Sequence, residues 1–216
     1  MSSVYKEWAV LHAKYDLLEP PIQKGSSFSI AGLLPVIDRN GTVWDRFSVL
    51  IDILSDYPSS LPTITEIGGR IPRSEQWHIN ADKTCCVGTV AEQYRKLHGR
   101  MNLLNWVDEF AIPFLANYIY KKEKGIYFNG EWPHGVKGIY ADYAQLFGIA
   151  DLGLLLQRMR YCCGSQSKSF NADCFCNSGK KYKRCYLIHI EQHRHYIPKK
   201  VIWRDVSLLE KFQKLR

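Results

Sequence analysis

Hydrophobic residues recur at helical spacing over the first fifteen residues of the chain. Val4, Trp8, Leu11 and Tyr15 lie three or four positions apart, which is typical of one face of an amphipathic helix. Ser3 stands in front of them as a candidate N-cap. The two prolines and the glycine of the following segment, "EPPIQKGSS", predict that the helix ends there.

Three segments beyond this break have the pattern of β-strands. Residues 28–36 and 47–53 alternate between hydrophobic and polar positions, and the run "LPTITEIGG" is rich in β-branched residues. The first two segments are separated by Asn40-Gly41, a dipeptide typical of tight hairpin turns. Because short turns connect antiparallel neighbours, we predict a meander of three or four antiparallel strands.

Helical spacing returns in the second half of the chain. The segment "NLLNWVDEFAIPFLANYIYKKEKG" carries a wide hydrophobic stripe and predicts a core-facing helix that bends at Pro113. Further helices are predicted over "IYADYAQLFG", over "DLGLLLQRMR" and at about residues 205–215. A helix, an antiparallel meander and then more helices indicate an α+β fold.

Composition narrows the class of protein. Of 216 residues, 46% are hydrophobic and 23% charged, which is ordinary globular composition and argues against wholesale disorder. No hydrophobic run approaches the roughly 20 residues of a membrane span, and the first residues lack the apolar core of a signal peptide. We therefore expect a cytoplasmic protein with no membrane partner. The formal net charge of +8 suits a nucleic acid, an acidic protein surface or simply a solvated basic surface.

The seven cysteines indicate reduced thiols, metal ligation or catalysis, because an odd number without a secretion signal does not suit a disulfide framework. Three of them lie in "CFCNSGKKYKRCYLIH", as Cys174, Cys176 and Cys185. The Ser-Gly turn between them would close a loop around a tetrahedral ion. This stretch resembles the SEC-C motif, a zinc-binding element of many bacterial proteins, and the resemblance implies a structural zinc in a module that docks a partner.

The fourth ligand departs from the SEC-C pattern. That motif has a cysteine or histidine directly after its third cysteine, where this chain has Tyr186. His189 follows Cys185 by about one helical turn and is the best replacement, with His193 or the pair Cys162-Cys163 as fallbacks. The predicted zinc ligands are Cys174, Cys176, Cys185 and His189. A metal-free cluster of thiols is the alternative.

Adjacent cysteines also occur in "WHINADKTCCVG", seven and eight positions after His78. One interpretation treats Cys85 and Cys86 as small core residues, because free cysteine is often buried. The other makes one of them a nucleophile, whose thiolate a nearby histidine and Lys83 would favour. The spacing alone leaves both interpretations open.

The order of elements resembles the ubiquitin-conjugating enzyme fold, with "YPSSLP" before the polar segment that leads to the cysteine. Ile79-Asn80 matches the Ile-Asn of that family's His-Pro-Asn-Ile-Asn motif. The resemblance then places Cys86 on the family's nucleophile and Cys85, the alternate nucleophile, on the apolar residue before it. It places His78 on the asparagine that is thought to stabilise the oxyanion, and it allows Asp82 to orient an acceptor lysine.

The stretch "GIYFNGEWPHGVKGIYADY" resembles the C-terminal half of a divergent bacterial branch of this family, and the helices around it are similar to that branch. Members of that branch resemble components of CBASS antiphage operons, which contain a cyclic-oligonucleotide synthase related to cGAS. The resemblance implies a thioester between Cys86 and the C-terminal carboxylate of the synthase, or of a ubiquitin-like protein, followed by transfer to a lysine. Residues 1–158 would form the conjugating domain, and residues 159–216 the zinc module with a basic tail.

Two other functions fit the same sequence. The first is a non-catalytic binding module of the related RWD type, in which both cysteines belong to the core. The second is a basic adaptor for nucleic acid or the ribosome that uses the zinc module and the tail from His193 to Lys200. Nucleic acid is not expected as a partner of the conjugating enzyme itself.

Overall fold

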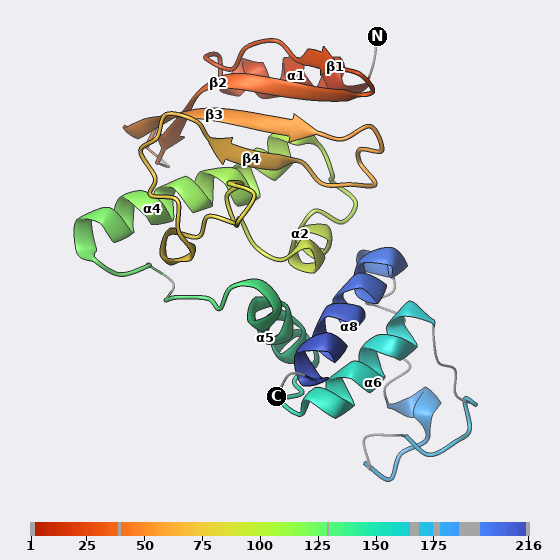
Figure 1. Cartoon of the computed structure of the whole chain (residues 1–216). Helices are drawn as coiled ribbons and strands as arrows, with labels where there is room; N and C mark the ends of the chain where they lie inside the picture. Colours follow the sequence, from red (N-terminus) through yellow and green to blue (C-terminus); the bar gives the residue numbers. More distant parts are fainter. Residues whose placement is uncertain are drawn as a thin grey trace. The chain divides into compact units, whose positions relative to one another are not determined.

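The computed structural model describes residues 3–38, 40–128, 130–164, 169–174, 178–185 and 195–214. The chain forms two compact units, each of which is described by itself below. The first consists of Met1–Gly88 and Gly99–Glu131, and the second of Thr89–His98 and Trp132–Arg216. The first unit contains a sheet and helices and the second is mainly helical, so the predicted α+β class is confirmed (Figure 1).

The sheet of the first unit is a four-stranded antiparallel meander, as the sequence predicts. Its strands are β1 (Ile22–Lys24), β2 (Ser27–Ile37), β3 (Val43–Ile53) and β4 (Thr63–Glu66), in the order β1-β2-β3-β4 (Figure 1). The turn between β2 and β3 contains the predicted Asn40-Gly41 dipeptide. Asp38 holds this turn, because its Oδ1 accepts from the backbone N–H groups of Asn40 (2.8 Å) and Thr42 (2.9 Å).

Alternation along β3 builds the core of the first unit. Phe47, Val49, Ile51 and Ile53 are completely buried, while the residues between them are partly exposed. Helix α1 (Ser3–Lys14) follows the predicted spacing and buries Val4 and Leu11. Glu7 of α1 accepts hydrogen bonds from the hydroxyl of Tyr57 (2.6 Å) and from the N–H of Leu103 (2.8 Å). These bonds connect α1 to two segments that are distant in the sequence.

The long helix predicted before Gly125 consists of three pieces. These are α3 (Leu103–Trp106), a π-helical turn η2 (Val107–Ala111) and α4 (Ile112–Lys124). The predicted irregularity is present, but it takes the form of a π turn that ends at Ala111, two residues before Pro113. Pro113 has no N–H to donate, so the regular hydrogen-bond ladder cannot continue through it.

The second unit is built around helices. They are α2 (Val90–Lys96), α5 (Gly135–Phe147), α6 (Leu152–Cys163) and α8 (Lys199–Lys214), and α8 packs on both α5 and α6. Helix α8 begins six residues before the predicted start at Asp205. The boundary predicted between residues 158 and 159 lies inside α6, whose Leu155, Met159 and Cys162 are buried in this unit. The units of the structure divide elsewhere, after residues 88, 98 and 131.

Polar side chains fasten the second unit internally. Asp142 on α5 accepts hydrogen bonds from the Thr89 hydroxyl and the Arg95 guanidinium, which ties α2 to α5. The fully buried Asp205 on α8 accepts from the hydroxyl of Tyr143 (3.1 Å) and from Arg204 (2.7 Å). Burial raises the pKa of the Asp205 carboxyl.

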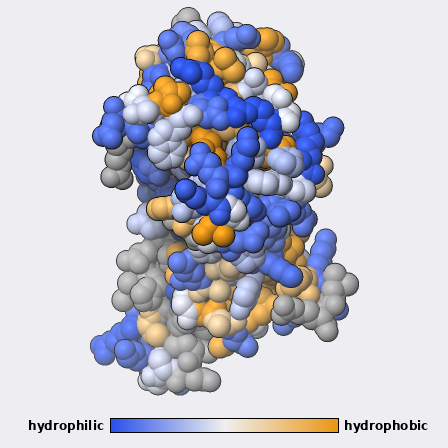
Figure 2. Space-filling view, turned by 90° about the vertical axis from the view of Figure 1, so that its left-hand side faces the viewer, coloured by the Kyte–Doolittle hydropathy of each residue, from blue (hydrophilic) through white to orange (hydrophobic). Residues whose placement is uncertain are grey.

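None of the described helices is by itself long and apolar enough to cross a bilayer. Helices α5 and α6 reach that length and hydropathy only when taken together, and the pair is bent by 77°. On the face drawn in Figure 2, hydrophilic residues surround small separate patches of hydrophobic ones.

Candidate active site at the His78–Cys86 hairpin

A short hairpin in the first unit carries the residues that the sequence singled out. It follows a 3-10 turn, η1 (Glu75–Trp77). Ile79 and Cys85 pair as an antiparallel bridge, and the N–H of Cys86 donates to the carbonyl oxygen of His78 at 2.7 Å. His78 and Cys86 therefore face each other at the base of a nine-residue hairpin.

The polar residues between them form the tip of the hairpin. The N–H of Asn80 donates to the carbonyl of Thr84 (2.8 Å), and Lys83 adopts a left-handed φ of 74°. Asp82 Oδ1 accepts from both the N–H (3.0 Å) and the hydroxyl (2.6 Å) of Thr84. These hydrogen bonds from Thr84 lower the pKa of the Asp82 carboxyl, which stays ionised and stabilises the turn.

Asp82 is thus separated from the candidate nucleophile. At a strand rise of about 3.3 Å per residue, the tip of the hairpin lies about 10 Å from its base at Cys86. The contacts that the structure gives to Asp82 are those with Thr84. If Asp82 contacts an acceptor lysine, as the resemblance implies, it does so at the tip of the hairpin and away from the Cys86 sulfur.

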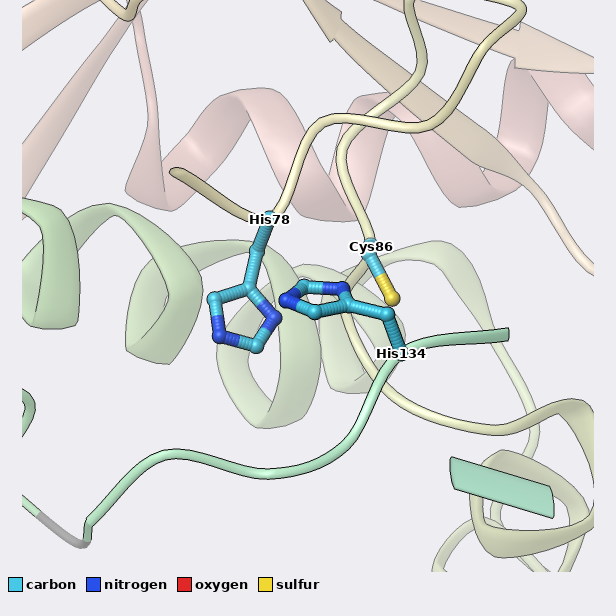
Figure 3. A group of neighbouring side chains, drawn as sticks. All are labelled: His78, Cys86 and His134. Carbon is cyan, nitrogen blue, oxygen red and sulfur yellow. The ribbon is translucent and has the colours of Figure 1, made fainter. Parts of the chain in front are cut away.

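The pairing distinguishes the two adjacent cysteines. Neighbouring pairs in an antiparallel ladder project to opposite sides, while the two residues of one pair share a side. The pair Ile79 and Cys85 points inward, with 6% and 5% exposure respectively. The next pair, His78 and Cys86, is half-buried, and both side chains leave the hairpin on the same side (Figure 3).

Cys85 is built into the core. Its N–H donates to the carbonyl oxygen of Ile64 on β4 (2.7 Å), which fixes the hairpin to the sheet. Burial raises the pKa of the Cys85 thiol to about 12, because the charged thiolate would lose its hydration. Cys85 therefore packs as a small apolar side chain, in the slot that the resemblance assigned to it.

The His78 side chain has a defined position beside Cys86. One ring nitrogen of His78 and the Cys86 Sγ lie within 4.8 Å of each other. The ring also packs edge-on against Tyr127, with ring centroids 4.6 Å apart at an angle of 81°. The His78 backbone is left-handed (φ 54°, ψ 41°), a conformation that non-glycine residues seldom adopt and that is often associated with functional sites.

A buried lysine supports the turn before His78. Lys121 on α4 is 7% exposed, and its Nζ donates to the carbonyl oxygen of Gln76 at 2.5 Å. The ammonium also lies 4.0 Å from the ring centroid of Tyr127 and 5.0 Å from that of Trp77. Because the hydroxyl of Tyr127 donates to the same carbonyl (2.9 Å), both side chains fix the residues directly before His78.

Lys121 and Tyr127 were not predicted from the sequence as parts of this site. Lys121 occupies a core position of the predicted helix, three and seven residues after the buried Tyr118 and Phe114. A lysine on the buried face of a helix needs a carbonyl or aromatic partner, and this charge on the hydrophobic stripe is the signal that could have identified it.

Lys121→Ala should destabilise the protein by about 2 to 4 kcal/mol, because it removes a charged hydrogen bond and two cation–aromatic contacts from a buried position. Urea unfolding followed by tryptophan fluorescence would measure the change. The matched control is Lys122→Ala, since Lys122 is exposed on the same helix and should change the free energy of unfolding by less than about 0.5 kcal/mol. Equal effects of the two variants would contradict the supporting role of Lys121.

The predicted zinc ligands are described only in part. Cys176 and His189 lie outside the described residues. Asp173 and Lys181 pair as an antiparallel bridge, and the N–H of Cys174 donates to the carbonyl of Lys180 (2.9 Å). The sulfur of Cys185 lies 3.4 Å from the hydroxyl of Ser178 in the turn that this bridge closes. Cys174 and Cys185 thus flank one turn, which suits two thiolate ligands of one ion.

Of the fallback ligands, His193 lies outside the described residues, and Cys162 and Cys163 lie on α6. Cys162 and Cys163 are buried at the end of α6, with 0% and 4% exposure. The described part of the module is anchored there, since the ring of Tyr182 packs 5.8 Å from that of Tyr161 on α6. None of the six cysteines in the described residues forms a disulfide.

The site is defined by residues of the first unit. His134, which Figure 3 also labels, belongs to the second unit. Within the first unit, His78 and Cys86 could supply two zinc ligands, an imidazole and a thiolate. A closed structural zinc site has four ligands, so these two residues do not form one by themselves. Comparisons of the chain with protein family models, with curated proteins and with solved structures found no match.

Proposed function

We propose that this chain is a cysteine-dependent acyl-transfer enzyme with a ubiquitin-conjugating-enzyme-like fold and that Cys86 is its nucleophile. The observation that carries the proposal is the hairpin that pairs Cys86 with His78 on an accessible side and buries Cys85 on the other. The α+β architecture, with a helix before an antiparallel meander and helices after it, is compatible with that fold.

In the first step, the Cys86 thiolate attacks the carbonyl carbon of an activated C-terminal carboxylate on a partner protein. A carbon–sulfur bond forms, the activating group leaves with its electron pair, and the partner is held as a thioester. The sequence has no glycine-rich phosphate-binding loop of the P-loop type for adenylating a carboxylate. The acyl group would therefore arrive already activated.

In the second step, an amine attacks the thioester carbonyl and gives a tetrahedral oxyanion. This intermediate collapses to an amide and releases the Cys86 thiolate. The His78 ring, on the same side of the hairpin as the sulfur, is placed to accept a proton from the attacking amine or to donate a hydrogen bond to the oxyanion. Tyr127 and Lys121 would keep the imidazole in this position.

The partners follow from the family resemblance. The acyl donor would be the C-terminus of a cyclic-oligonucleotide synthase of an antiphage system, or of a ubiquitin-like protein, and the acceptor a lysine side chain. Asp82, at the tip of the hairpin, would meet the acceptor protein rather than the reacting atoms. The cysteine-rich module would hold a structural zinc and dock one of these proteins.

Cys86→Ala should abolish a covalent adduct that reducing agent removes, because no other accessible thiol lies in the hairpin. The adduct would be detected on non-reducing gels with the candidate synthase and an activating enzyme present. Cys85→Ala should retain it. His78→Ala should retain the thioester but slow transfer to the amine by about 10² to 10⁴-fold, which is the usual contribution of a general acid or base. Adduct that persists in Cys86→Ala would overturn the proposal.

The main rival is a binding module with the same fold and no chemistry. It would leave the half-buried Cys86 without a reaction and would show no thiol-sensitive adduct in any variant. The same gels therefore separate the two functions, and binding of the synthase without an adduct would favour the rival.

A further inference from the structure

The net positive charge of this protein comes from one of its two units. Within Thr89–His98 and Trp132–Arg216 the sequence has 17 Lys and Arg residues and 7 Asp and Glu residues, a net charge of +10. The remaining residues, Met1–Gly88 and Gly99–Glu131, have 12 basic and 14 acidic residues, a net charge of −2. The unit with the candidate active site is thus slightly acidic. The other unit is strongly basic and is the one that would attract anions.

Helix α8 gathers much of this charge on its exposed face. The face that packs into the unit consists of Val201, Ile202, Asp205, Val206 and Leu209. The exposed positions include Lys199, Lys200, Trp203, Arg204, Ser207, Lys211 and Lys214. At about 100° per residue these positions share an arc of about 140°, and from first to last they extend about 22 Å along the helix. We refer to these seven residues as the basic stripe.

Each acidic residue of α8 is paired with an arginine. The buried Asp205 accepts hydrogen bonds from Tyr143 and from Arg204, which belongs to the stripe. Glu210, which lies on the same arc of the helix, forms an ion pair with Arg160 of α6 at 2.6 Å. The excess positive charge of the stripe therefore comes from its four lysines, Lys199, Lys200, Lys211 and Lys214.

An aromatic side chain interrupts this row. Trp203 is 49% exposed between Lys199 and Ser207, although tryptophan is mostly buried on average. Tyr196, 38% exposed, lies one turn before the helix begins and packs edge-on against His98 at 4.7 Å. Cations alone would suit any anionic surface, whereas an exposed indole ring among them offers a platform on which a flat base can stack.

We propose that the basic stripe of α8 binds single-stranded nucleic acid, with lysine ammonium groups on the phosphates and a base stacked on Trp203. This inference goes beyond the acyl-transfer function and does not depend on it. It also revises the expectation from the sequence that nucleic acid is not a partner. The chemistry selects a single strand because its bases are free to stack, while those of a duplex are paired within it.

Fluorescence anisotropy of a labelled (dT)20 or (rU)20 strand with the full-length protein tests the proposal. Binding should weaken with salt, with a log–log slope of about −2.8 for four phosphate contacts. Trp203→Ala should weaken binding about 5 to 100-fold at an unchanged salt slope, and Trp203→Phe should restore part of the affinity. The triple variant Lys199→Gln, Lys211→Gln, Lys214→Gln should reduce the slope by about two.

The matched control changes two exposed lysines of the first unit, Lys122→Gln and Lys124→Gln, and should bind as the wild type does. Far-ultraviolet circular dichroism of each variant confirms that α8 is intact. Equal binding of heparin, which has no bases, with no effect of Trp203→Ala would show a general site for acidic partners and overturn the proposal. Tighter binding of a duplex of the same length would overturn it as well, and so would no binding at low salt.

Discussion

Iodoacetamide should alkylate Cys86 in the folded protein at pH 8 and leave Cys85 unmodified. Alkylation requires the thiolate, and a pKa of about 12 leaves only about one part in 10⁴ of Cys85 ionised at this pH. In an unfolded chain, a cysteine of ordinary pKa, about 8.5, is ionised to about a quarter at this pH. Because Cys85 is also only 5% exposed, we expect the folded protein to react at Cys85 about 10³-fold or more slowly than such a cysteine, while the half-buried Cys86 is modified first. Peptide mapping by mass spectrometry would distinguish the adjacent sites.

Three comparisons make this result specific. In 8 M urea the two cysteines should react at similar rates, since the difference comes from the fold. In Cys86→Ala, Cys85 should remain unmodified in the folded protein, while Cys85→Ala should leave the modification of Cys86 unchanged. Faster alkylation of Cys85 would mean that the side-chain alternation of the hairpin is reversed, and the nucleophile would have to be reassigned.

Purified protein should contain one zinc ion per chain, and Cys174→Ser or Cys185→Ser should each lose it. Structural zinc contributes folding free energy on the order of 10 kcal/mol, so the loss of one thiolate should unfold the module around Tyr182. Elemental analysis measures the metal, and resistance of the module to proteolysis measures its fold. Serine retains the size of cysteine, so a loss of metal would report ligation rather than packing.

Cys86→Ser is the matched control for these variants, because Cys86 lies in the first unit and should not alter the zinc content. His189→Ala and Cys176→Ser test the two predicted ligands that the described residues do not include. Protein that is folded and protease-resistant without stoichiometric zinc would instead support the metal-free thiol cluster.

Patterns that depend on neighbouring residues could be predicted from the sequence. The alternation of Phe47, Val49, Ile51 and Ile53 predicts β3, because a strand with one buried face has a period of two. The same alternation places Cys85 and Cys86 on opposite sides of the hairpin, and Cys85 is the inward one because its partner Ile79 faces the core. The Ile-Asn match of the family resemblance implied this pairing, and the bridge between Ile79 and Cys85 shows it.

Features that depend on distant contacts could not be predicted. Lys121 lies next to Gln76 only because α4 packs beside the segment before the hairpin, and the spacing of residues along the helix does not contain that contact. The division of the chain has the same cause. Thr89 and Arg95 join the second unit through Asp142, about fifty residues away, so a boundary drawn by composition at residue 158 could not reproduce it.

The bond from the Cys85 N–H to the Ile64 carbonyl has a consequence for the behaviour of the protein in solution. Strand β4 is at the edge of the sheet and pairs with β3 on one side only. An open edge is a template for strand addition by another molecule and a common start of aggregation. The hairpin with Cys86 occupies part of this edge, so the nine residues of the candidate site also cover an edge of the sheet that another molecule could otherwise extend.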